Sequence, residues 1–93
     1  MNILWSVRAR NELRAIHAYI ARDSTFYADR MILRILARIE AAAQAPTRGH
    51  RVHEYPEAQF REVHEPPYRI IYAISDRTLQ VVTIVHFKQE LNG

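Results

Sequence analysis

Apolar residues recur in three short segments towards the end of the chain, Phe60–His64, Tyr68–Ile74 and Leu79–Phe87. The connections between them, residues 65–67 and 75–78, are too short to hold a crossover helix, so neighbouring segments are expected to pair as antiparallel strands. In the last two segments, apolar side chains occupy both alternating sets of positions. The pattern therefore predicts a three-strand meander with both faces at least partly covered.

Two stretches with helical spacing precede the meander. Apolar residues three and four positions apart predict a first helix over about Val7–Arg22 and a second over about Ser24–Ala45. Ser6 and Ser24 are the expected N-caps, and Pro46 ends the second helix. Because only a short break separates the helices, we expect an antiparallel hairpin.

The first apolar residues, Asn2–Trp5, are too few for a helix and predict a strand added to the edge of the meander. The expected fold class is α+β, with a helical hairpin on an antiparallel sheet and a single domain over residues 1–93. The core is expected to include Trp5, Leu13, Ile16, Ile20, Ile32, Ile35, Ile39, Ile70, Tyr72, Val82 and Ile84.

Composition narrows the class of protein. Apolar residues make up 48% of the chain, which is ample for a globular domain, and there is no cysteine for a disulfide or a thiolate metal site. No segment approaches the roughly 20 apolar residues that span a bilayer, and no secretory signal is recognised. We therefore expect a cytoplasmic protein without a membrane partner.

The basic residues are almost all arginine. The formal net charge is +3, and Lys88 is the single lysine. Arg30, Arg34 and Arg38 recur four residues apart on the second predicted helix, where they form either a solvated face or a docking strip for an acidic partner. Either an acidic protein segment or a nucleic acid is a common partner of a small basic domain.

The segment between the second helix and the meander, residues 47–57, is expected to be a loop. It carries Arg48 and Arg51 together with His50 and His53, which are three residues apart. Since no cysteine or third clustered ligand joins the two histidines, we expect a cationic loop, with no metal site and no cofactor.

The order of these motifs resembles the RelE/ParE toxins of type II toxin–antitoxin modules, over nearly the whole chain. The resemblance is carried by Trp5-Ser6 before the first helix, Phe60-Arg61-Glu62-Val63, Pro66-Pro67, Tyr68-Arg69-Ile70-Ile71-Tyr72 and the closing Val85-His86-Phe87-Lys88. It implies a bacterial growth-arresting toxin of a plasmid stabilisation module, silenced by a ParD-like antitoxin. Arg61, Arg69 and the Arg30–Arg38 strip are then candidate anchors for antitoxin or target carboxylates.

The family resemblance leaves two targets open. RelE-like toxins cut mRNA in the ribosome, which requires an acid, a base and cations around the phosphate, whereas ParE-like toxins inhibit DNA gyrase. This chain has His64 where the nuclease pattern has arginine, and no tyrosine follows Lys88. These departures favour the gyrase reading, under which no residue is catalytic. His64, His86 and Lys88 are the catalytic candidates under the ribonuclease alternative.

A third reading is a plain nucleic-acid-binding module. It is disfavoured because helix-turn-helix spacing is absent and the tyrosine pair on alternating strand positions, Tyr68 and Tyr72, shares a face with apolar residues. We expect both tyrosines in the core.

Overall fold

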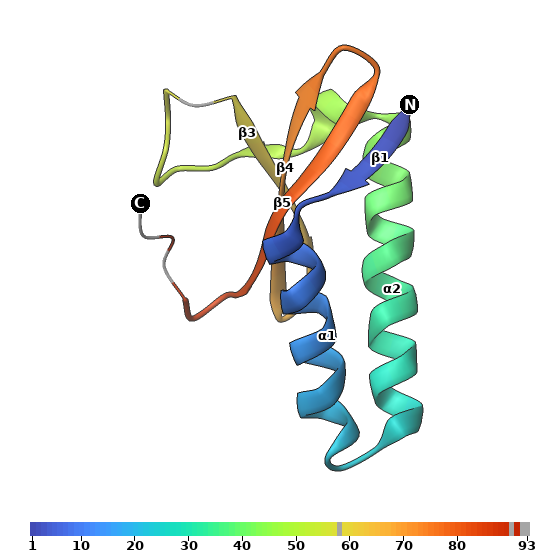
Figure 1. Ribbon diagram of the computed structural model, residues 1–93. Coiled ribbons are helices and arrows are strands. Elements are labelled where there is room, and N and C mark those ends of the chain that lie inside the picture. Colours follow the sequence, from blue (N-terminus) through green and yellow to red (C-terminus); the bar gives the residue numbers. More distant parts are fainter. Residues whose placement is uncertain (58, 90, 92–93) are drawn as a thin grey trace.

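The computed structural model describes residues 1–57, 59–89 and 91. A β-strand, β1 (Asn2–Trp5), leads into a helical hairpin of α1 (Val7–Ala21) and α2 (Thr25–Gln44), a 3₁₀ turn η1 (Pro46–Arg48) and four further strands. Figure 1 shows the hairpin against one side of the sheet. We call this side of the sheet the helix face and the opposite side the loop face. The four later strands are β2 (His50–Arg51), β3 (Phe60–Glu65), β4 (Tyr68–Ser75) and β5 (Thr78–His86).

The sheet has the order β1-β5-β4-β3-β2, so the predicted α+β architecture and the meander β3–β5 are confirmed. One detail differs from the prediction of an antiparallel sheet. β1 pairs parallel to β5, which makes the sheet mixed. The parallel pairing is possible because the hairpin and three strands separate β1 from β5 in the chain, and parallel neighbours need a long connection.

Both predicted N-caps are confirmed. Ser24 Oγ accepts a hydrogen bond from the Tyr27 amide at the start of α2. Ser6 Oγ accepts from the Ala9 amide at 2.9 Å and also donates to the Val82 carbonyl at 2.7 Å. The hydroxyl of Ser6 therefore caps α1 and ties its first turn to β5.

Two clusters of buried residues lie on the two faces of the sheet. The larger, on the helix face, contains the predicted residues Ile16, Ile35, Ile39, Ile70, Tyr72 and Ile84. Ile70 is fully buried and Ile84 is 3% exposed, as predicted for core residues. Partly buried residues packed against this cluster include Trp5, Leu13, Ile20 and Ile32, while Val82 packs against the smaller loop-face cluster of Val52, Ile71 and Val85.

A β-bulge interrupts the regular alternation of β5, in which Val81 and Thr83 would share one face of the sheet and Ile84 would lie on the other. Ile71 pairs with Thr83, but the next residue, Tyr72, pairs with Val81, so Val82 is an extra residue. As a result, Val81 and Ile84 both belong to the helix-face cluster.

A carboxylate from α1 satisfies polar groups beside the bulge. Thr83 Oγ1 donates to the Glu12 carboxylate at 2.7 Å, and the Ile84 amide donates to the same group at 3.0 Å. Glu12 and Ser6 thus join the first two turns of α1 to the irregular part of β5.

The segment expected to be a loop contains the short strand β2, which forms the sheet edge beside β3. The buried Tyr72 hydroxyl anchors the start of this segment by donating to the Pro46 carbonyl at 2.6 Å. A Cβ atom at Gly49 would collide with the Tyr72 hydroxyl, so the close approach of backbone to ring requires glycine. Among the described residues, no helix combines the length and apolarity needed to cross a membrane.

Candidate functional site

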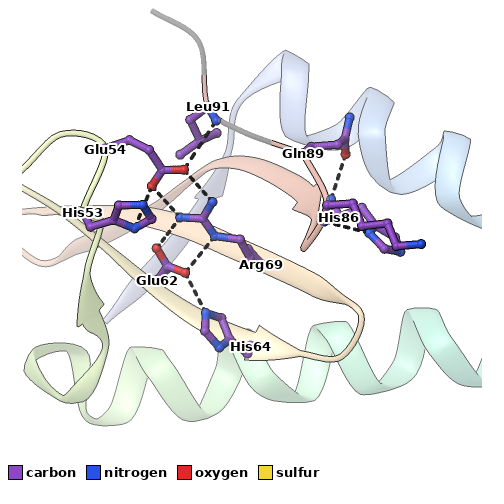
Figure 2. Close-up of polar contacts among 9 residues, drawn as sticks. His53, Glu54, Glu62, His64, Arg69, His86, Gln89 and Leu91 are labelled. Atoms are coloured by element: carbon purple, nitrogen blue, oxygen red, sulfur yellow. Dashed lines mark hydrogen bonds and ion pairs between the residues drawn. The ribbon is translucent and has the colours of Figure 1, made fainter.

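Arg69, one of the predicted anchor residues, is buried in an ion-pair network on the loop face. Its guanidinium donates to both oxygens of Glu54, at 2.7 and 2.8 Å, and to both oxygens of Glu62, at 2.9 and 2.6 Å. Figure 2 shows the guanidinium between the two carboxylates. The Arg69 side chain is 9% exposed. While these four bonds persist, the guanidinium is engaged inside the protein and is not presented to a partner's carboxylate.

The network stabilises the charged forms of all three groups. Hydrogen bonds from Arg69 lower the pKa of Glu54 to about 2. Burial opposes ionisation of Glu62, but hydrogen bonds from Arg69 and His64 outweigh it and hold the pKa of Glu62 below its usual value. Hydrogen bonds to Glu54 and Glu62 raise the pKa of Arg69. The three side chains therefore form a permanently charged unit at neutral pH.

We expect acid to unfold the protein through this network. Both glutamate pKa values are lowered by folding, so their contribution to stability is complete above the ordinary value of 4.5 and is lost as the pH falls from there towards about 2. Urea unfolding followed by circular dichroism across this range should show the loss of stability. The Glu54→Gln variant should show a shallower dependence on pH, and an unchanged slope would contradict the assignment.

His64 lies at the edge of this network beside an open hollow on the loop face. The hollow is lined by His53, Glu62, His64, Arg69 and Phe87. His64 Nε2 lies 2.6 Å from a Glu62 oxygen, and the His64 ring contacts the Phe87 ring edge-to-face with centroids 5.1 Å apart. A protonated His64 would therefore bridge solvent and the buried Glu62 carboxylate.

The other two catalytic candidates lie elsewhere. His86 pairs with Tyr68 across β4 and β5, whereas His64 pairs with the next residue, Arg69, so the two histidines point to opposite faces of the sheet. Figure 2 shows His86 apart from His64 and next to Gln89. His86 Nδ1 accepts from the Lys88 amide, while the Lys88 side chain is exposed. The structure does not bring His64 and His86 together as an acid and base pair.

A basic groove lies where the end of α2 meets β3. We use this name for the hollow lined by Arg38, Ala41, Ala42, Ala45, Arg48, Gly49 and Val63. Arg61 adjoins it, because Arg61 Nη1 donates to the Gly49 carbonyl at 2.8 Å. Two of the predicted anchors, Arg38 and Arg61, are thus brought to one place, although Arg38 also pairs with Glu65 at 3.2 Å.

Two arginines beside this groove face each other directly. Arg51 of β2 and Arg61 of β3 are register partners at the edge of the sheet. Like charges opposite one another on adjacent strands are destabilising. Within the described residues neither arginine has a carboxylate within ion-pair distance. The sheet edge therefore carries uncompensated positive charge that an acidic partner would neutralise.

The remaining predicted anchors, Arg30 and Arg34, are exposed on α2 and lie towards the tip of the hairpin, away from the basic groove. The strip Arg30–Arg38 therefore follows the middle of α2, and only its last member, Arg38, lines the basic groove. Glu54 and Arg51 were not singled out as site residues, because a glutamate or arginine in an irregular segment carries no periodic signal. Their roles follow from the position of the loop against β3 and β4.

Comparisons with known proteins agree with this architecture. A toxin–antitoxin structure described as the chromosomal ParDE TA system from P. aeruginosa superposes with a TM-score of 0.75 at 18% identity, covering 92% of this chain and 95% of that chain. A YoeB/ParE toxin from Agrobacterium tumefaciens superposes with a TM-score of 0.64 at 17% identity, covering 92% and 98%. At these identities the two structures establish the shared fold.

Sequence comparison establishes the family. The toxin RelE2 of Caulobacter vibrioides is 36% identical over 85 residues, covering 90% of this chain and 92% of that protein. The family described as "ParE toxin of type II toxin-antitoxin system, parDE" matches residues 3–91. This chain therefore belongs to the ParE toxin family of type II toxin–antitoxin systems, as the motifs in the sequence predicted.

Proposed function

We propose that this toxin arrests bacterial growth by binding and inhibiting DNA gyrase, and that the acidic tail of a ParD-like antitoxin neutralises it. Family membership supports the role of toxin. The observation that carries the choice of gyrase is the separation of His64 and His86 on opposite faces of the sheet. A protein that acts by binding needs no assembled acid and base, because gyrase itself performs the DNA chemistry.

Two observations support an antitoxin as partner: the similarity to a known toxin–antitoxin structure and the positive charge at the sheet edge. The neighbour from P. aeruginosa is described as a ParDE TA system. In this chain, the facing pair Arg51 and Arg61 lies beside the basic groove. An acidic, extended segment lying along this edge would convert arginine–arginine repulsion into arginine–carboxylate pairs, which are bidentate in favourable geometry. Small alanine side chains in the groove leave room for the main chain of such a segment.

The experiment that tests the target uses two tubes. Purified protein is added to gyrase with supercoiled plasmid, and separately to ribosomes programmed with mRNA. We expect inhibited gyrase with trapped, cleaved DNA in the first tube and intact mRNA in the second. The His64→Ala and His86→Ala variants should inhibit gyrase within a few-fold of the parent protein, since no proton transfer by these side chains is required.

One observation favours a second candidate, the ribosome-dependent ribonuclease. His64 lies against Glu62 and Phe87 at an open hollow, where a histidine backed by a carboxylate could act as a general acid or base on RNA. Cleaved mRNA in the ribosome tube, reduced ~100-fold by His64→Ala or His86→Ala while gyrase is unaffected, would replace the gyrase proposal with this one.

A further inference from the structure

The tip of the helical hairpin carries an exposed aromatic and arginine surface, which we call the tip patch. It surrounds a hollow of ≈ 380 Å³ lined by Ile20 of α1 and by Phe26, Tyr27, Arg30, Met31 and Arg34 of α2. Phe26 and Tyr27 are 61% and 65% exposed. Figure 1 shows this end of the hairpin projecting past the sheet, so neither sheet face covers it.

The tip patch is ordered by its own contacts and remains open to a partner. The Phe26 and Tyr27 rings meet edge-to-face with centroids 5.4 Å apart, and the Arg30 guanidinium lies 5.5 Å from the centre of the Phe26 ring. Such contacts restrict the side chains before binding, which lowers the entropy lost when a partner docks. The floor of the hollow is apolar, because partly buried Ile20 and Met31 form it.

The charge around the hollow indicates which kind of protein segment is complementary to it. Within the described residues, Arg30 and Arg34 have no ion-pair partner. The nearby carboxylate of Asp29 is bound to His17 Nε2 at 2.8 Å. An apolar floor between two such arginines is complementary to an amphipathic segment with an apolar side chain flanked by carboxylates. Aromatic residues, methionine and arginine are also the residues enriched at the centres of protein interfaces.

The tip patch and the basic groove have no lining residue in common, although they lie along the same helix. Their nearest lining residues, Arg34 and Arg38, are one turn apart, or roughly 6 Å along the axis of α2. The groove is lined by arginine and alanine without an exposed aromatic ring, which suits an extended acidic tail. The tip combines an apolar hollow, two exposed rings and a projecting shape, which suits insertion into a recess of a large folded protein.

We propose that the tip patch holds the toxin on its target protein, by seating an acidic amphipathic segment of that target. An apolar side chain of the segment enters the hollow above Ile20 and Met31, and flanking carboxylates pair with Arg30 and Arg34. This inference rests on the proposed function, because it takes the target to be a protein that the toxin binds without catalysing a reaction.

The test compares a tip variant, Tyr27→Ala with Arg30→Glu, with the matched control Leu33→Ala. Leu33 is 65% exposed on the same helix but does not line the hollow. We expect the tip variant to require at least about 30-fold more protein for half-maximal gyrase inhibition and to lose growth arrest on expression, while its affinity for the cognate antitoxin stays within about threefold. The control should match the parent protein in all three assays.

Circular dichroism melting establishes that each variant is folded, and Phe26→Ala serves as a second tip variant if the first is not. A tip variant that still arrests growth like the parent protein would overturn the inference. An equal loss of antitoxin affinity would also overturn it, because the patch would then belong to the antitoxin. Failure of the parent protein to inhibit gyrase would count against gyrase as the target. It would not count against the tip patch, which the growth-arrest assay tests separately.

Discussion

Replacing Arg69 with alanine should lower the free energy of unfolding by about 3–5 kcal/mol, which is a large fraction of the total stability of a small domain. The side chain makes four hydrogen bonds to Glu54 and Glu62, and the Glu62 side chain is only 6% exposed. Removing the guanidinium takes away the cation that binds both carboxylates, so the two neighbouring carboxylates must either repel each other or take up a proton. Urea unfolding monitored by circular dichroism at neutral pH measures the loss.

The matched control for this variant is Arg34→Ala, which removes an exposed arginine from α2 and should change stability by no more than about 0.5 kcal/mol. The Arg69→Ala variant should also regain part of its stability on mild acidification, as the carboxylates become protonated. The parent protein should keep the contribution of these glutamates over the same range, and lose it only as the pH falls below about 4.5. A cost below about 1 kcal/mol for Arg69→Ala would show that the network does not hold the loop against the sheet.

Reversing the charge of Arg51 should weaken antitoxin binding roughly 100-fold while slightly stabilising the toxin alone. Glutamate at this position would face Arg61 across the sheet edge, replacing a repulsive cross-strand pair with an attractive one. The same substitution would place a negative charge against the proposed acidic tail, and such like-charge contacts cost several kcal/mol in an interface. Titration calorimetry with the antitoxin and thermal melting of the free toxin measure the two effects.

Weaker antitoxin binding together with a more stable free toxin would separate a role of Arg51 in the interface from a purely structural role. The Arg14→Glu variant provides the control, because Arg14 is exposed on α1 and, among the described residues, its side chain hydrogen-bonds only to Asn11. It should bind the antitoxin within about threefold of the parent protein. Added salt should reduce the difference between parent and Arg51→Glu. Antitoxin affinity unchanged by Arg51→Glu would remove the sheet edge from the proposed antitoxin site.

Local patterns in the sequence were sufficient for the secondary structure and for much of the core. Helical spacing and the serines Ser6 and Ser24 predicted both helices to within one or two residues, because periodicity and capping are properties of neighbouring residues. The short connections between strands required an antiparallel meander. The order of the Arg-Glu, Tyr-Arg and Val-x-His motifs along the chain was enough to indicate the toxin family.

Tertiary structure decided what depended on contacts between distant segments. The parallel pairing of β1, the bulge at Val82 and the strand β2 depend on how the strands pair in the folded sheet, which the pattern within one strand does not specify. The distribution of free charges on the surface also depended on contacts in the folded structure. Arg69 became an internal ion-pair partner because the loop carrying Glu54 folds over β3 and β4, and the bulge carried Ile84 to the helix face. Sequence periodicity specifies which residues can share a face, but long-range packing determines which charges remain free to bind a partner.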